Sequence, residues 1–137
     1  LKIHTNMYPE QFRAFKNFKG IIIEGTGLGQ TPGDVIDAST KIHKQIVNEL
    51  KKLTKSAVVA MTSQCIYGRI DMNVYSKGRM LQDLGVIGNF CDMTPETAFI
   101  KLSWLLSNYK KEEVKELFVK DLRGEISSKS NYQDKFL

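Results

Sequence analysis

The residues that most suggest chemistry lie in the stretch IIIEGTGLGQTPGD, which spans positions 21–34 and places glycines directly after an apolar run. A glycine-rich loop between a buried strand and a helix is typical of sites whose backbone N–H groups bind phosphate. Here the spacing GTGLGQTPG matches neither the dinucleotide pattern nor the P-loop, and Pro32 interrupts the turn into a helix. The next apolar run ends in MTSQ, without the acid that a ribose requires. The sequence therefore argues against a nucleotide site.

What remains is a loop with polar side chains at the carboxyl end of a strand, where parallel sheets place ligands. A second polar loop, TSQCIYGRIDMNVYSKGR, follows the next strand and should open at the same edge. This arrangement predicts a site for a polar, uncharged or zwitterionic ligand. The main candidates are Gln30, Tyr75 and Thr26, and the further candidates are Thr31, Ser63 and Gln64. The alternative is that the glycines only satisfy positive φ angles in a tight turn.

No complete catalytic set accompanies these loops. His4 and His43 have no nucleophile that the spacing would place beside them, and the loop acids lack metal-ligand spacing. Cys65 and Cys91 form no C-x-x-C pair, so we expect two reduced core residues rather than a zinc site or a disulfide. We expect this domain to bind no metal and no cofactor.

The elements that must position the loops follow from hydrophobic periodicity. Continuous apolar runs predict strands near residues 20–25 and 56–64, the alternation in LKIHTN predicts a strand over 1–6, and VIG predicts a short last strand over 86–88. Between and after them, apolar spacing predicts helices over 9–19, over about 13 residues from Ser39 or Thr40, and over 74–84, 95–107 and 110–121, with Thr94 as a cap. The predicted fold is therefore α/β: a three-layer, Rossmann-like unit with a small parallel sheet of about four strands flanked by helices. Its domain should span residues 1–126, followed by a polar tail over 127–137.

Composition narrows the class further. The chain has 137 residues, of which 42% are hydrophobic, which fits one domain with a real core. Its apolar runs are far shorter than the roughly 20 residues that a membrane span requires. The net charge of +5 includes a lysine patch at positions 51, 52 and 55, which we interpret as a solvated helix face with at most a weak attraction to RNA. The start at Leu1, without a secretory signal, suggests a piece of a longer cytoplasmic protein.

Four colinear motifs carry a resemblance to a known family: GIIIEGTGLGQTP, TSQCIYGRIDMNVYSKGR, LGVIGNFCDMTPETAFIKLSWLLS and DLRGEIS. Together they resemble the carboxyl-terminal domain of the asparaginase/glutaminase family. Within it, they look most like the asparaginase-like D subunits of archaeal glutamyl-tRNA(Gln) amidotransferases. The match runs from about Phe15 to Ser127.

The resemblance implies a separate amino-terminal domain that holds the nucleophilic threonine, so this chain alone should be inactive. The present domain would supply homodimer contacts and lend substrate-positioning residues to the site of the neighbouring copy. The position of Gln30 is asparagine in asparaginases, and that of Tyr75 is acidic or tyrosine; glutamine at position 30 departs from the asparaginase pattern.

The resembled D subunit hydrolyses glutamine, or asparagine, to ammonia. A partner E subunit uses that ammonia, with ATP and Mg, to convert Glu-tRNA(Gln) to Gln-tRNA(Gln), so tRNA would be reached through the complex. Two alternatives stay open: the same domain of a free-standing cytoplasmic L-asparaginase, and a non-catalytic α/β assembly module. An extra domain ahead of the asparaginase fold would distinguish the amidotransferase from the free-standing asparaginase.

Overall fold

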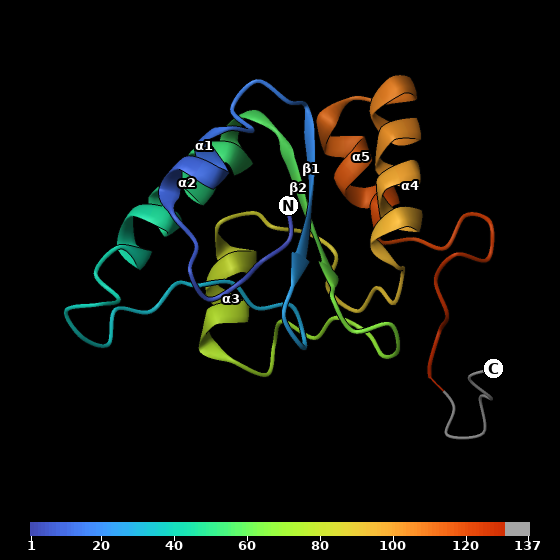
Figure 1. Cartoon of the computed structure of the whole chain (residues 1–137). Coiled ribbons are helices and arrows are strands. Elements are labelled where there is room, and N and C mark those ends of the chain that lie inside the picture. Colours follow the sequence, from blue (N-terminus) through green and yellow to red (C-terminus); the bar gives the residue numbers. More distant parts are fainter. Residues whose placement is uncertain (131–137) are drawn as a thin grey trace.

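A parallel sheet forms the centre of the molecule in a computed structural model that describes residues 1–130; the predicted tail from residue 131 onward lies outside the described residues. Strands β1 (Gly20–Gly25) and β2 (Val58–Ser63) pair in parallel from Gly20↔Val58 to Gly25↔Ser63. Both strands point toward the same end of the molecule (Figure 1). The α/β fold predicted from alternating strands and helices is confirmed.

The sheet continues on both sides, but only by single bridges. Lys2 pairs with Glu24 of β1, and Ile87 pairs with Ala60 of β2, both in parallel. Ile87 N–H donates to Val59 O at 3.0 Å, and Met61 N–H donates to Ile87 O at 2.8 Å. The four predicted segments thus lie side by side, although only two form regular strands. On the β2 side the pairing is short because Gly88, with a φ of 106°, turns the chain away.

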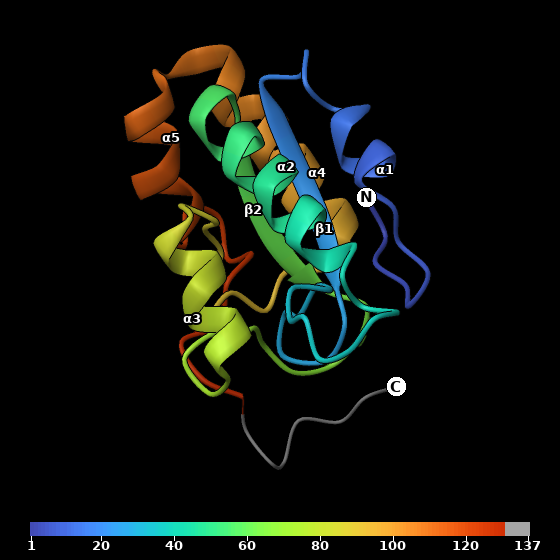
Figure 2. The same ribbon diagram turned by 90° about the vertical axis from the view of Figure 1, so that its left-hand side faces the viewer.

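Helices cover both faces of this sheet. One layer contains α1 (Pro9–Arg13), α2 (His43–Ser56) and α3 (Ser76–Asp83), and the other contains α4 (Pro95–Asn108) and α5 (Lys111–Phe118) (Figures 1 and 2). The isoleucines of β1 divide between the two cores: Ile21 and Ile23 pack toward α1 and α2, whereas Ile22 packs toward α4. A continuous apolar strand is therefore buried on both faces, as the sequence predicted.

Three local predictions were wrong. The first helix ends at Arg13 because the chain then tightens into turns, with Lys16 N–H bonded to Arg13 O, and Phe18 is left 59% exposed. Helix α2 begins at His43, since residues 37–42 form turns in which Thr40 N–H donates to the Asp37 carboxylate at 3.0 Å. Cys65 is exposed rather than part of the core. The cap at Thr94 is confirmed by a bond from Thr97 N–H, 3.4 Å long.

The segment after α5 is fastened to α4 by a shielded ion pair. Lys101 Nζ lies 2.5 Å from Glu125 Oε1, and their side chains are 6% and 13% exposed. Burial alone would raise the pKa of Glu125, but hydrogen bonds from Lys101 and from backbone N–H groups lower that pKa to about 2.

Across residues 1–130, none of the helices has both the length and the apolar content to span a bilayer.

Candidate functional site

The loops that follow β1 and β2 meet at the carboxyl edge of the sheet. Ser63 Oγ donates to Gly27 O at 2.5 Å, and Gln64 N–H donates to Gly25 O at 2.9 Å. Further along the second loop, Asp71 N–H donates to Leu28 O at 3.1 Å. These bonds make the two loops one connected surface, in the place where a parallel sheet presents ligands.

The first loop closes on itself. Thr26 N–H donates to Gln30 O at 3.1 Å, and Gln30 N–H donates to Thr26 O at 2.9 Å. The turn passes through Gly29, whose φ of 101° is in the region that favours glycine. A Cβ at this glycine would also lie 2.9 Å from Met61 Cγ. The loop therefore delivers Gln30 and Thr31 in a fixed position beside the end of the sheet.

Gln30 and Thr31 carry the least expected feature of the molecule. Both polar atoms of the Gln30 amide, and the hydroxyl oxygen of Thr31, are buried without a hydrogen-bond partner among the described residues. Thr31 as a whole is only 3% exposed. An unpaired buried polar group costs about 1–3 kcal/mol, and such groups in native proteins are few. Two neighbouring side chains are thus held in a state that a further hydrogen-bonding partner would relieve.

Two other candidates are already occupied by structural hydrogen bonds. The Gln64 side-chain nitrogen donates to Ile3 O at 2.6 Å and to Glu24 O at 2.9 Å, which ties the amino-terminal segment to β1. Ser63 Oγ bridges the two loops and also accepts from Cys65 N–H. Thr26 takes part through its backbone, and its side chain is exposed. The side chains of Ser63 and Gln64 therefore hold the loops at the carboxyl edge of the sheet in place.

Tyr75 lies at the far end of the second loop, where it is the residue before α3, and its side chain is 55% exposed. Arg79 donates to Asn73 O at 2.7 Å and so holds the chain segment that leads to Tyr75. An ion pair of 3.2 Å between Lys77 and Asp34 links the start of α3 to the end of the first loop. Tyr75 is thereby held at the margin of the surface, where its ring can reach outward.

Among the described residues, the other titratable groups show no catalytic arrangement. His43 Nδ1 lies 2.7 Å from Asp34 O. The Asp37 carboxylate accepts hydrogen bonds within the turn that it begins, and the bond from the Ser39 hydroxyl is the main cause that lowers its pKa. Desolvation raises the pKa of the Cys91 thiol to about 11, which leaves it unreactive. Within residues 1–130 there is no group of three or more His, Cys, Asp or Glu side chains that could hold a metal ion.

Exposed apolar residues of these two loops were not among the candidates predicted from the sequence. Ile36 is 80% exposed and Ile66 is 77% exposed, and Val35 and Tyr67 are more than half exposed. The sequence did contain an indication of these residues, because isoleucine and valine are unusual in loops rich in Gly, Asp and Ser. Several large apolar side chains around one polar edge are typical of a surface that another protein part covers.

The fold and the site together define an α/β domain in which two hydrogen-bonded loops meet at the carboxyl edge of a parallel sheet. A family model described as the Glutaminase/Asparaginase C-terminal domain matches residues 1–118. The chain belongs to this family.

Known relatives agree with this assignment. The chain is 47% identical over 136 residues to the D subunit of the glutamyl-tRNA(Gln) amidotransferase of Methanococcus maripaludis, a match that covers 97% of the chain and 30% of that protein. It is 43% identical over 122 residues to the D subunit of the same enzyme from Methanobrevibacter smithii, with 88% and 26% covered. The chain thus spans less than a third of the length of these curated relatives.

Solved structures show the same fold. The thermostable L-asparaginase from Thermococcus kodakarensis superposes with a TM-score of 0.81 at 28% identity, covering 94% of this chain and 37% of that one. L-asparaginase I from Vibrio cholerae gives 0.77 at 30% identity, with 93% and 36% covered. The resemblance inferred from the four motifs is confirmed, and so is the identity of the domain.

Proposed function

We propose that this chain is the carboxyl-terminal domain of an amidotransferase subunit that hydrolyses glutamine to release ammonia for the amidation of Glu-tRNA(Gln). The nucleophile would belong to an amino-terminal domain of the same longer protein. A partner E subunit would use the ammonia together with ATP and Mg, in a cytoplasmic complex built on a homodimer. The proposal rests on the names of the relatives, which are tRNA-dependent amidotransferase subunits.

One structural observation carries the role of this domain. The Gln30 amide and the Thr31 hydroxyl, on consecutive residues of the first loop, are buried and have no hydrogen-bond partner within residues 1–130. An amide offers two donors and an acceptor, and a hydroxyl offers a donor and an acceptor, which suits the ammonium and carboxylate groups of an amino-acid substrate. Their task would be to hold the substrate so that its side-chain amide faces the distant nucleophile. Tyr75, exposed at the margin of the same edge, would contact it from the side.

A second candidate function is that of a free-standing L-asparaginase. The observation that favours it is the superposition on L-asparaginase structures, with a TM-score of 0.81 for the first of them. Purified full-length protein separates the two. An amidotransferase subunit should convert Glu-tRNA(Gln) only when the E subunit, ATP, Mg and glutamine are all present. Full activity on asparagine, with no transfer of ammonia in the complete mixture, would favour the asparaginase.

The positioning role is tested by Gln30→Leu and Thr31→Val in the full-length protein, with ammonia release as the assay. One neutral hydrogen bond contributes about 1 kcal/mol, so kcat/KM for the preferred amide should fall about fivefold to tenfold in each variant. Gln45→Leu, the same change at an exposed site on α2, is the matched control and should leave kcat/KM unchanged.

Two results would contradict the proposal. Unchanged kcat/KM in both site variants would remove Gln30 and Thr31 from the substrate contacts. Ammonia release from glutamine or asparagine by the pure 137-residue chain would contradict the assignment of the nucleophile to another domain.

A further inference from the structure

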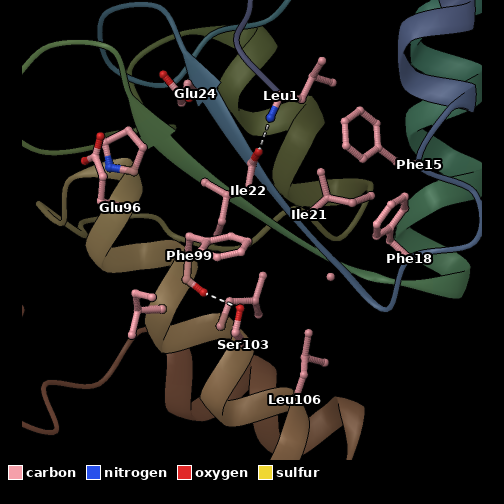
Figure 3. A pocket seen from close by; sticks show the side chains of 14 residues that line it. Leu1, Phe15, Phe18, Ile21, Ile22, Glu24, Glu96, Phe99, Ser103 and Leu106 are labelled. Atoms are coloured by element: carbon pink, nitrogen blue, oxygen red, sulfur yellow. Dashed lines mark hydrogen bonds between the residues drawn. The ribbon is translucent and has the colours of Figure 1, made fainter.

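Tyr75 is an exposed ring whose own contacts do not fix its direction. Other aromatic rings at the surface rest on a neighbouring ring. Phe15 and Phe18 lie beside β1 with their ring centroids 5.7 Å apart (Figure 3), and Trp104 and Tyr109 meet edge to face at 5.8 Å. Among residues 1–130, the side chain of Tyr75 has neither a ring contact nor a hydrogen bond. The backbone that carries this ring must therefore set its direction.

The start of α3 departs from the usual preferences at Tyr75. This residue is the N-cap of the helix, where Ser, Thr, Asp and Asn are preferred because their side chains accept a hydrogen bond from the first turn. The tyrosine side chain makes no such bond, and residues 76–79, the first turn of α3, include no acidic residue to suit the positive end of the helix. Such departures are expected where a side chain serves function more than the fold.

Arg79 holds the chain in front of α3 from inside the helix. Its guanidinium Nη1 donates to Asn73 O at 2.7 Å and to Val74 O at 3.3 Å, the carbonyl oxygens of the two residues that precede Tyr75. Its backbone N–H donates to Tyr75 O at 3.2 Å. The carbonyl groups of three consecutive residues are therefore bonded to one arginine.

The segment before these residues is anchored to the core. Met72 is fully buried, and its N–H donates to the side-chain oxygen of Asn89 at 2.8 Å. Only Asn73 and Val74 lie between this anchor and Tyr75, and Val74 is half exposed. The contacts of Arg79 thus act on the short stretch that separates a fixed residue from the exposed ring.

We propose that Arg79 is a positioning residue, which directs the ring of Tyr75 toward the substrate by holding the backbone in front of α3. The inference rests on the proposed function, in which Tyr75 contacts an amino-acid substrate from the margin of the carboxyl edge. Arg79 itself touches neither the substrate nor the reacting amide. In the competing explanation, Arg79 only stabilises the start of α3, and substrate binding does not depend on it.

A double-mutant cycle in the full-length protein, with ammonia release as the assay, tests the proposal. Tyr75→Leu should lower kcat/KM for the preferred amide about tenfold, and Arg79→Met should lower it about fivefold through the same contact. In the Tyr75→Leu background, Arg79→Met should have a further effect of less than about twofold, because the ring that it positions is gone. Arg79→Lys keeps the charge on a shorter side chain and should lower kcat/KM about twofold.

The division of the effect between kcat and KM gives a second readout. Whichever of the two parameters changes in Tyr75→Leu should also change in Arg79→Met. A loss of helix stability alone would instead lower the fraction of folded enzyme and leave KM unchanged.

Two variants outside the loops are matched controls. Arg13→Met removes an arginine of α1 that pairs with Glu49 at 3.4 Å, and Tyr109→Leu removes another exposed tyrosine, at the end of α4. Both should leave kcat/KM unchanged.

Three results would overturn the proposal. If Arg79→Met lowers kcat/KM by the same factor in both backgrounds, Arg79 acts independently of Tyr75, and the proposed function still stands. A change of kcat in one single variant and of KM in the other would have the same meaning. An unchanged kcat/KM in Tyr75→Leu would remove the Tyr75 contact itself, and with it that part of the proposed function. If Arg79→Met does not fold, the same cycle with Arg79→Lys decides between these results.

Discussion

Replacing Gln30 by leucine should stabilise this chain. The two polar atoms of the Gln30 amide are buried without partners in the described part of the chain, and leucine has a similar size but no polar group. Each unpaired buried group costs about 1–3 kcal/mol, and the fit of a branched side chain takes back part of that gain. We therefore expect the free energy of unfolding to rise by about 1–2 kcal/mol, and the Tm by roughly 3–8 °C.

Urea unfolding of the 137-residue chain is the assay, because an unchanged m value shows that the gain is one of stability alone. Gln64→Leu is the matched control. Its amide nitrogen makes bonds of 2.6 and 2.9 Å to Ile3 O and Glu24 O, so the same substitution should here destabilise by about 2 kcal/mol. The two variants are thus predicted to differ in sign.

A fall in stability for Gln30→Leu would refute this reasoning, because it would show that the amide already has a partner in the isolated chain. A rise in stability together with a loss of kcat/KM in the full-length protein would have a different meaning. It would show that the fold tolerates an unfavourable group at this position for the benefit of the site.

Three further predictions concern stability and reactivity. Glu125 has a pKa of about 2 in the fold, below its usual value of 4.5, so its contribution to stability is present above pH 4.5 and is lost as the pH falls toward 2; in Glu125→Gln, acid titration should show a shallower loss over that window. Gly88→Ala should destabilise by about 2–4 kcal/mol, because φ is 106° and the new Cβ would lie 2.5 Å from a backbone oxygen of β2, whereas Gly27→Ala, with open space around it, should cost about 1 kcal/mol in the same thermal melts. A thiol reagent at pH 7 should label the exposed Cys65 quickly and the buried Cys91, with a pKa of about 11, only on unfolding; equal labelling of both in the folded chain would contradict the described core.

Periodicity predicted the layers of this fold because each strand is a continuous apolar run. Three consecutive isoleucines in β1 have no face to give to water, and the structure buries them under helices on both sides. The ends of the helices were harder to predict from the sequence. Phe12, Phe15 and Phe18 have helical spacing, yet the helix ends at Arg13, where the chain tightens into turns that leave Phe18 exposed.

The candidate site was predicted in part for a similar reason. The glycine spacing and the parallel direction of the strands predicted that two loops would lie at one edge of the sheet. In the structure a hydrogen bond from Ser63 to Gly27 O joins these loops. The distinction among the polar candidates could not be seen in the sequence. Gln30 and Gln64 are the same residue type in neighbouring loops, but among the described residues one side chain has no partner and the other has two. Which glutamine is left unpaired depends on distances across the sheet.

The ion pair between Lys101 and Glu125 bears on where this domain can be cut. The family match ends at residue 118, so a clone designed on that boundary would omit Glu125 and the Lys120 carbonyl to which Lys101 also donates. The ammonium of Lys101 would then be left on α4 without its carboxylate, and removing one partner of a buried pair costs about 3–5 kcal/mol. An expression clone should therefore extend at least through residue 127, whose N–H is bonded to Asp92. For this chain, the end of the family-model match is not the end of the folding unit.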